Sequence, residues 1–470
     1  MTNSIDFHVI NMDSRYAIFH PESMSLFSVT EHSGKILKCF EESRELKDIA
    51  SDLRITEDNA KEELCELNKK IRYIPCKDLE LVGNEPQSIC MIISQDCNLR
   101  CEYCYADHGE YHKTKQLMNF TTAKLCIEKL FKNAVHDKYF ILFFGGEPLL
   151  NFSLMNEIEA YRIGKELKID YYIVTNGTIL TDPIKDFFNT HISSAMISLD
   201  GMKESNDKLR HGNVKSVHDQ VITTIQELNK SRTYPIAVKS IITKENFNKI
   251  EEISDYIGSL GVDSLMITPI HFVGKENRLN MDDCQFNTYL DGISAVLRKN
   301  INLLATNGNF FYTSAIDILR QLATKRIKIR QCSAGIKYVA ISADGDVYPC
   351  NGCIGMNEFY MGNVYDEDFP GDRYYTIKQL FKDNTIHASN ECRTCWARYI
   401  CGGDCAINSY MNNGDLSIPS ERHCIMMKEI IETLLLEIAY IFKDTTKRQK
   451  ILNKLSMVSD SYKLRSKHGE

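Results

Sequence analysis

From Ile89 onward the sequence alternates between short apolar segments and longer amphipathic ones. The longer segments repeat apolar residues at helical spacing, as in 246–259. Such strand–helix units in succession predict an α/β fold with a parallel sheet, either open or curled into a partial (βα)6 barrel. Ligands of these folds bind at the carboxyl ends of the strands. The expected strands are 89–94, 139–144, 170–174, 193–199, 235–242 and 262–268.

The first 83 residues are expected to form a separate unit. Two candidate strands, 16–20 and 25–30, are joined by a turn at Pro21, and three helical segments follow them. A hairpin with three helices is a winged-helix-like arrangement. The complete division is a winged-helix-like unit (1–83), a strand–helix core (84–300), a helical linker (301–328), a cysteine-rich region (329–430) and a C-terminal helix with a basic tail (431–470).

Charge and hydropathy exclude several classes of protein. The chain holds 56 Lys and Arg against 63 Asp and Glu, a net charge of −7, which disfavours a nucleic-acid binder. No segment is long and apolar enough to cross a membrane, and Met1–Ile10 does not resemble a signal peptide, so we expect a cytoplasmic protein without a membrane partner. Residues 447–470 are basic and are either a solvated end or a docking surface for an acidic peptide.

Cysteine is the residue type that points to chemistry. Of 17 cysteines, eleven fall in two groups, Cys97–Cys104 and Cys332–Cys424. Disulfides are rare in the cytosol, so metal binding is the leading explanation for the two groups. We interpret the other six as small buried hydrophobic residues: Cys39, Cys65, Cys76, Cys90, Cys126 and Cys284.

The first group has the spacing C-x3-C-x2-C and directly follows the first strand of the core. Its members are Cys97, Cys101 and Cys104. Three thiolates on one short loop can hold three corners of a 4Fe–4S cube and leave the fourth iron open to another ligand. The alternative is structural zinc, which requires a closed set of four ligands; the nearest additional candidates are His108 and His112.

The second group is spread over the cysteine-rich region. It comprises Cys332, Cys350 and Cys353, then Cys392-x2-Cys395-x5-Cys401-x3-Cys405, and finally Cys424. The pair Cys392 and Cys395, taken alone, would also suit half of a zinc ribbon.

The first triplet, together with Phe143-Phe-Gly-Gly-Glu-Pro148 after the second strand, resembles the radical S-adenosylmethionine (SAM) superfamily and its GGEP motif. The resemblance implies that Gly145, Gly146 and Glu147 bind the amino group of SAM. It also implies that Tyr103 packs by the adenine, that Ser198 contacts the ribose and that Arg210 binds the carboxylate. Other interpretations stay open, because Asn176 and Asp200 suit turn capping and Arg210 suits a surface ion pair.

The second group resembles the SPASM extension of peptide-modifying radical SAM enzymes. The resemblance assigns Cys392, Cys395, Cys401 and Cys424 to one auxiliary 4Fe–4S cluster, and Cys332, Cys350 and Cys405 to another. With the SAM-binding cluster this makes three. Cys353 is additional to the seven-cysteine pattern, and it either closes the second auxiliary cluster or stays a free thiol.

The front unit resembles the recognition element of maturases that act on ribosomally synthesised peptides, which captures a leader peptide as an added strand. The whole chain looks most like the thioether-forming maturases of the ranthipeptide (SCIFF) and sactipeptide groups. The resemblance implies that a 5′-deoxyadenosyl radical removes hydrogen from a carbon of a cysteine-rich precursor, that a cysteine sulfur of the same peptide bonds to that carbon, and that an auxiliary cluster accepts an electron. An external flavodoxin- or ferredoxin-type protein would supply electrons.

Three other functions stay open at this stage. Sulfatase-type maturation to formylglycine is one, although Asn351 follows Cys350 where that family typically has Asp. Carbon–carbon crosslinking or epimerisation of a peptide is another. The third is an iron–sulfur redox regulator that binds DNA through the front unit, which the small number of Lys and Arg in residues 1–60 disfavours.

Overall fold

The computed structural model describes residues 6–71, 77–78, 85–132, 136–270, 277–306 and 308–464. For 77–78 and 456–464 only the backbone is described. Cys76, the expected boundary at residue 83 and the last six residues of the basic tail lie outside these ranges.

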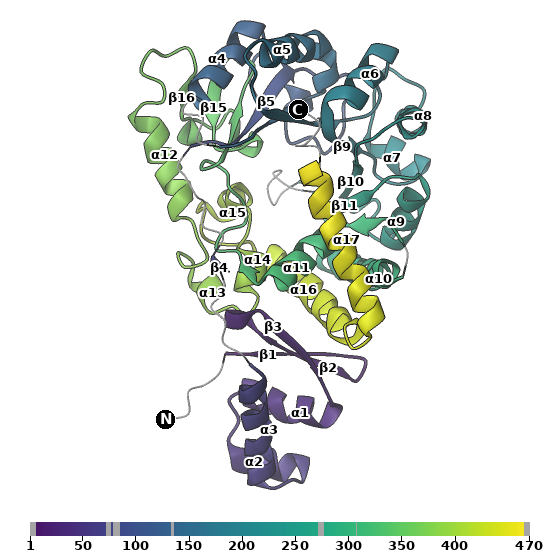
Figure 1. The fold of residues 1–470 in the computed structure, drawn as a ribbon, viewed down its shortest axis with the longest axis vertical. Coiled ribbons are helices and arrows are strands. Elements are labelled where there is room, and N and C mark those ends of the chain that lie inside the picture. The colour runs from purple at the N-terminus through teal and green to yellow at the C-terminus, as the bar shows by residue number, and fades with distance from the viewer. Residues whose placement is uncertain are drawn as a thin grey trace.

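The strand–helix alternation forms the predicted parallel sheet. Six consecutive strands, each hydrogen-bonded in parallel to the next, make up its centre. Figure 1 shows this sheet bending into an arc with helices on its outer side, which confirms the α/β fold predicted from the sequence. The strands are β5 (Ser88–Gln95), β7 (Tyr139–Gly145), β8 (Ile169–Thr175), β9 (Ile192–Ser198), β10 (Ile236–Ile242) and β11 (Ser264–Pro269).

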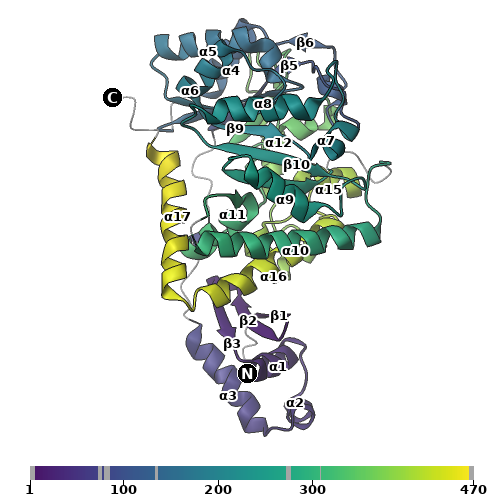
Figure 2. The same ribbon diagram turned by 90° about the vertical axis from the view of Figure 1, so that its right-hand side faces the viewer.

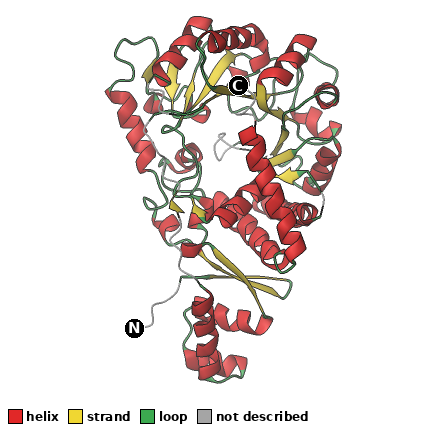
Figure 3. Cartoon of the chain, in the orientation of Figure 1, coloured by secondary structure: helices red, strands yellow, loops and turns green. Residues whose placement is uncertain are grey.

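The outer layer of the arc consists of helices that alternate with these strands (Figure 2). They are α4 (Phe120–Leu130), α5 (Phe152–Gly164), α6 (Asp182–His191), α7 (Lys203–Leu209), α8 (Val217–Asn229), α9 (Ile250–Ser259) and α10 (Asp283–Ala305). Figure 3 shows the same arrangement by type of element.

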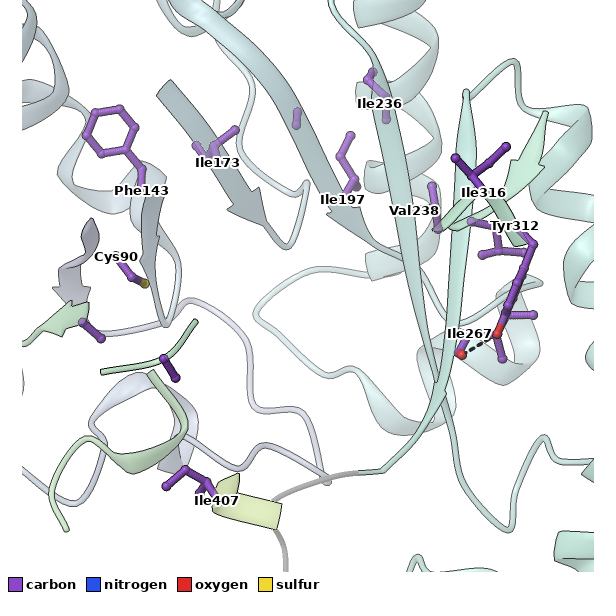
Figure 4. Close-up of a cluster of buried hydrophobic side chains, with 14 of the residues drawn as sticks. Cys90, Phe143, Ile173, Ile197, Ile236, Val238, Ile267, Tyr312, Ile316 and Ile407 are labelled. Carbon is purple, nitrogen blue, oxygen red and sulfur yellow. Dashed lines mark hydrogen bonds between the residues drawn. The ribbon is translucent and has the colours of Figure 1, made fainter. Parts of the chain in front are cut away.

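Side chains alternate between the two faces of the arc because successive residues of a strand point to opposite sides. Ile173, Ile197 and Val238 are fully buried and belong to the main hydrophobic core (Figure 4). In the same core the hydroxyl of Tyr312 donates to the carbonyl of Ile267 at 2.8 Å. The residues next to Ile173, Ile197 and Val238 in the sequence are only partly buried and face the inside of the arc. The inner face is therefore free to line a cavity.

At both ends the sheet continues with strands that lie outside the strand–helix core predicted from the sequence (84–300). At one end β12 (Phe311–Tyr312) pairs with β11, and at the other β14 (Tyr338–Ile341) pairs in parallel with β5. Helix α10 crosses the expected boundary at residue 300, and the exact division into domains stays a prediction. The remaining short strands are β15 (Asp346–Tyr348), β16 (Gly362–Asn363), β6 (Gln116–Leu117), β13 (Arg326–Ile327) and β4 (Lys77–Asp78).

From residue 313 onward the chain contains the linker helix, the short helices of the cysteine-rich region and two long helices. These helices are α11 (Thr313–Thr324), α12 (Asp372–Asp383), α13 (Asn390–Arg393), α14 (Arg398–Cys401), α15 (Ala406–Asn413), α16 (Glu421–Ile441) and α17 (Thr445–Leu464). No helix among the described residues combines the length and hydrophobicity needed to cross a membrane.

The front unit is a three-stranded antiparallel sheet followed by three helices. The predicted hairpin is formed by β2 (Arg15–His20) and β3 (Ser25–Val29), and β1 (His8–Met12), which the sequence analysis did not identify, pairs with β2. β1 lacks a polar–apolar alternation because its first three residues are all buried. The helices are α1 (Glu31–Glu41), α2 (Leu46–Leu53) and α3 (Glu57–Lys70).

The front unit rests on α16 (Figure 1). His8 is buried between two carboxylates, with Nδ1 2.6 Å from Glu41 and Nε2 2.7 Å from Glu432 of α16. Arg15 pairs with Glu437 at 2.7 Å. These contacts fix the front unit against the rest of the chain.

Candidate functional site

The loop of the first cysteine group lies at the carboxyl edge of β5 and is fixed on both sides. On one side the backbone amides of Arg100 and Glu102 donate to His211 and Leu209, at 2.6 and 2.9 Å. On the other side Asn176, at the end of β8, donates to the Asn98 side chain at 2.8 Å. The loop that carries all three thiols is therefore held in place by hydrogen bonds on both sides.

The three thiols lie close to one another in a mostly apolar setting. Burial raises the pKa of the Cys97 thiol to about 12, and the nearby Cys101 and Cys104 contribute to the rise. Burial also raises the pKa of Cys101 to about 11. Thiols of this kind are neutral until a metal displaces their protons. Three clustered thiols of this kind suit an iron–sulfur cluster as its ligands.

The glycines of the GGEP motif permit close approach of two parts of the backbone. A Cβ on Gly146 would lie 2.4 Å from the carbonyl oxygen of Asp96 and 2.8 Å from the Cβ of Cys97. A Cβ on Gly109 would lie 2.6 Å from the Cα of Gly146. Gly145 has φ of +147°, which favours glycine. These residues pack the end of β7 against the cysteine loop. No motif in the sequence points to Gly109.

Glu147 is completely buried at the same edge. Its carboxylate accepts hydrogen bonds from the Thr175 hydroxyl at 2.8 Å and from the backbone amides of Asn176 and Leu149 at 2.7 and 3.1 Å. Even so, burial raises its pKa to about 7. No Lys, Arg or His in the described part of the chain forms an ion pair with it. A ligand with an ammonium group would supply the missing positive charge, so this carboxylate fits the amino group of SAM.

Asp200 joins two residues that the sequence analysis selected separately. Its carboxylate accepts hydrogen bonds from the Tyr103 hydroxyl, from Arg210 Nε at 2.9 Å and from the Ile241 amide at 2.9 Å. The guanidinium of Arg210 lies 5.5 Å from the centre of the Tyr103 ring. All three side chains are buried. Arg210 is therefore in a buried ion pair rather than the surface pair considered above.

The two terminal nitrogens of Arg210 have no hydrogen-bond partner among the described residues. Those nitrogens can donate hydrogen bonds to a carboxylate ligand, so Arg210 fits the role that the resemblance implies, which is to bind the carboxylate of SAM. Asn176 acts partly as a turn residue, since its Oδ1 accepts from the Thr178 amide at 2.9 Å, and partly as a tether of the cysteine loop.

The inner face of β9 and β10 carries polar residues. Ser198, at the end of β9, is in register with Lys239 of β10. Burial and the nearby Arg210 lower the pKa of Lys239. No carboxylate in the described part of the chain pairs with this ammonium. The sequence analysis did not identify Lys239, because a lysine on an apolar strand gives no motif.

The cysteines of the second group separate into two sets. Burial raises the pKa of Cys401 to about 12, and Cys392, Cys395 and Cys424 are near enough to raise it further. Burial raises the pKa of Cys405 to about 12 as well, and its thiol neighbours are Cys350 and Cys332. These neighbours agree with the two sets that the sequence resemblance implies, and the assignment of ligands to clusters stays a prediction.

Cys353 lies beside the second set, and its role as a fourth ligand or a free thiol stays open. It is fully buried, and its sulfur lies 3.8 Å from that of Cys350. Asn351, between them, donates to the Tyr105 hydroxyl at 2.7 Å and accepts from the Tyr338 hydroxyl at 3.1 Å. This connects the cysteine-rich region to the loop of the first group.

The loop that carries Cys395 touches the front unit. The Trp396 ring stacks on His8 with ring centres 3.9 Å apart and planes 8° from parallel. Arg398 donates to the carbonyl of Cys395 at 2.8 Å and pairs with Glu22 at 2.6 Å. The sequence analysis identified neither Trp396 nor Arg398, because such contacts between distant segments leave no local pattern.

A cavity of about 2440 Å³ occupies the inside of the arc, toward the amino ends of the strands. Inward residues of β7 to β10 line it, among them Leu142, Val174 and Met196. Val174 immediately precedes Thr175, the hydroxyl partner of Glu147. The cavity therefore extends along the sheet to the level just below the strand ends.

Comparison with known proteins identifies the two cysteine-bearing regions. A sequence model of the radical SAM superfamily matches residues 91–278, and a model of the SPASM iron–sulfur cluster-binding domain matches residues 332–396. The chain contains a radical SAM domain followed by a SPASM domain. The first domain implies a 4Fe–4S cluster with SAM, which decides against zinc at the first triplet, and the second implies auxiliary iron–sulfur clusters.

Two curated relatives illustrate the range of this group. The radical SAM cyclopropyl synthase TigE of Paramaledivibacter caminithermalis is 24% identical over 463 residues, covering 92% of this chain and 94% of TigE. A cysteine-type anaerobic sulfatase-maturating enzyme of Clostridium novyi is 24% identical over 385 residues, covering 77% of this chain and all of the relative (100%).

Solved structures share the fold of this radical SAM/SPASM protein. Native anSMEcpe with bound AdoMet superimposes with a TM-score of 0.63 at 18% identity, covering 76% of this chain and 100% of that one. Streptococcus suis SuiB bound to its precursor peptide SuiA gives a TM-score of 0.51 at 16% identity, covering 89% and 98%. The second comparison extends over more of this chain.

Proposed function

We propose that this protein is a peptide maturase that installs thioether crosslinks, from a cysteine sulfur to a carbon, in a ribosomally synthesised precursor. The observation that carries the proposal is an unfilled groove on the front unit. About 400 Å³ in volume, it lies along β3 and α3 and is lined by Phe27, Val29 and Leu67. β3 is an edge strand of its sheet. An edge strand beside apolar pockets suits capture of a leader peptide as an added strand.

Two comparisons support a peptide as substrate. TigE aligns over 92% of the chain, which is too much to leave out the whole front unit, and SuiB was solved with a precursor peptide. Sulfatase-type maturation is the alternative from a related class, supported by the relative from Clostridium novyi. That relative covers less of this chain than TigE does.

The residues of the site have separate tasks in this proposal. Cys97, Cys101 and Cys104 hold the first cluster, Glu147 and Arg210 receive the amino and carboxylate groups of SAM, and the buried edge excludes water. The bound cluster and nucleotide supply one-electron hydrogen abstraction. The sheet interior holds the target carbon near that edge.

The proposed carbon–sulfur bond formation is an oxidation of the peptide by two electrons. The peptide loses one hydrogen atom from carbon and one proton from the thiol, the carbon–sulfur bond forms, and one electron is left over. An auxiliary cluster of the SPASM domain accepts that electron. We also propose a flavodoxin- or ferredoxin-type donor and a cytoplasmic location, and none of the sixteen described cysteines forms a disulfide, which suits the cytosol.

The test is anaerobic coexpression with a cysteine-rich peptide encoded beside the gene, followed by mass spectrometry. A thioether removes two hydrogens and one alkylatable thiol per link, and the link survives reductant. Carbon–carbon bond formation, which the similarity to TigE makes the second candidate, removes two hydrogens but leaves the thiol count unchanged. An unmodified peptide, with no 5′-deoxyadenosine formed from SAM and dithionite, would refute the enzyme proposal.

A further inference from the structure

Helix α17 carries a stripe of positive charge that the site described above does not use. Lys447, Lys450 and Lys454 follow one another at spacings of three and four residues, so they lie on one face of the helix. Arg448 is adjacent, and residues 445–455 contain no Asp or Glu. In the part of the chain that the structure describes, none of these cations pairs with a carboxylate.

The lower end of the stripe lies at the groove of the front unit. Tyr440 and Lys443, at the junction of α16 and α17, line the same groove as Phe27 and Leu67. The Lys443 ammonium lies 4.3 Å from the centre of the Tyr440 ring, and Lys443 is exposed. A peptide held in the groove would therefore leave it beside Lys443, four residues before the stripe begins.

The upper end of the stripe lies at the cavity inside the arc. Lys454 lines that cavity and donates a hydrogen bond to the carbonyl of Gly308, another lining residue. Burial and the charge of Lys450 lower the pKa of Lys454, so the positive charges of the two lysines lie close enough to repel each other. Figure 2 shows α17 running along the edge of the molecule from the front unit toward the sheet.

The separation of the two ends suits a short piece of peptide. Lys443 and Lys454 are eleven positions apart along the chain, roughly 16 Å at the rise of a helix. An extended peptide covers that distance with about five residues. One extended peptide is therefore long enough to contact the groove, the stripe and the cavity in turn.

We propose that the stripe of Lys447, Lys450 and Lys454 binds an acidic segment of the precursor peptide, between its leader in the groove and the part that enters the cavity. This inference rests on the proposed maturase function and adds the chemistry of the connecting segment. Carboxylates of Asp or Glu are the complement that an unpaired row of ammonium groups requires. The contact is electrostatic and exposed, so salt weakens it.

The test measures the binding of a fluorescein-labelled hexaglutamate peptide to the full chain, reconstituted anaerobically, by fluorescence anisotropy. The triple variant Lys447→Gln, Lys450→Gln, Lys454→Gln is compared with a matched control, Lys47→Gln, Lys61→Gln, Lys124→Gln, which removes the same charge from exposed lysines outside the groove and cavity. We expect at least tenfold weaker binding in the stripe variant, less than twofold in the control, and a smaller salt dependence in the stripe variant.

Three outcomes would overturn the inference: no binding of hexaglutamate to the native chain, an equal loss in both triple variants, or tighter binding of a 20-nucleotide RNA or of anionic vesicles at the stripe. Iron content and circular dichroism of both variants verify that they fold. A native chain that cleaves SAM but ignores hexaglutamate contradicts this inference alone, whereas a chain that never cleaves SAM contradicts the proposed function itself.

Discussion

Replacing Glu147 by Gln separates the charge of this side chain from its size. In the native chain both carboxylate oxygens are occupied, one by Thr175 and Leu149 and the other by the amide of Asn176. The variant keeps the volume but turns one acceptor oxygen into an NH2 group. Glu147→Gln therefore removes a buried negative charge and breaks at least one of three hydrogen bonds.

The two effects of this variant on stability oppose each other. The pKa of Glu147 is about 7 against an ordinary value of 4.5, so burying the charge costs about 3 kcal/mol above pH 7. A buried N–H without an acceptor costs about 1–3 kcal/mol. Because the pKa is raised in the folded state, the native chain loses stability as pH rises from 4.5 to 7, and the variant does not. Relative to the native chain, the variant should gain about 1.4 kcal/mol between pH 6 and pH 8.

Binding of SAM should respond in the opposite way. An ammonium group pairs with the carboxylate but not with a neutral amide, and a charge-assisted hydrogen bond contributes about 1.5–3 kcal/mol. We expect SAM to bind Glu147→Gln roughly 10- to 150-fold more weakly at pH 8. In the native chain the carboxyl must lose its proton first, so SAM affinity should fall about tenfold per pH unit below 7.

Two measurements check these numbers under anaerobic conditions. Equilibrium dialysis of SAM against the reconstituted proteins gives the affinities, and urea unfolding of the cluster-free chains gives the stabilities at pH 6 and 8. Unchanged SAM affinity in Glu147→Gln at pH 8 would refute the assignment of the amino group to this carboxylate. A variant that retains the native dependence on pH would show that another group titrates.

Three further predictions follow from buried groups. Cys353→Ser should lower the iron content from about twelve to about eight atoms per chain, because the Cys353 sulfur adjoins that of Cys350; unchanged iron would make Cys353 a free thiol. Asp200→Asn should lower the free energy of unfolding in urea by about 3–5 kcal/mol, since Arg210 stays buried without its counter-ion, and a loss below 1 kcal/mol would contradict the buried pair. Glu41 and Glu432 outweigh burial and raise the pKa of His8, so the charge that stabilises the front unit is complete below pH 6.5 and is lost as pH rises through that raised pKa. Hydrogen exchange of β1–β3, corrected for its intrinsic rate, should quicken from pH 6.5 to 9 in the native chain and stay constant in His8→Phe.

The sequence was a good guide to the strands and to the residues at their ends. The strands of the core carry continuous apolar runs, and the cysteine triplet and GGEP motif follow directly after two of them. Parallel strands bring their carboxyl ends to one edge, so residues after different strands meet there. This is why Glu147 and Arg210 could be selected before their partners were known.

The partners themselves could not be predicted. β10 reads IAVKSII, and its alternation puts Lys239 on one face and Ser240 on the other, but each face holds both apolar and polar residues. The pattern therefore does not say which face is inside. The hydrogen bonds from Asn176 to Glu147 and from Tyr103 to Asp200 join segments 29 and 97 residues apart, which no local pattern encodes.

The contacts between the front unit and the SPASM domain mechanically connect the groove proposed for peptide capture to the loop of Cys392, Cys395 and Cys401, which belongs to the first of the two proposed auxiliary sites. Trp396 follows Cys395 directly and stacks on His8, while Arg398 is bonded both to the Cys395 carbonyl and to the front unit. A rotation of the front unit on α16 would have to break the stack and the ion pairs together, or else shift the loop that holds Cys392, Cys395 and Cys401. Because the groove and the lower end of the α17 stripe both include residues near Tyr440, the same rotation would also change the start of the peptide path. The groove proposed for peptide capture and the auxiliary site proposed near Cys395 are thus held in a fixed relation by one small set of contacts.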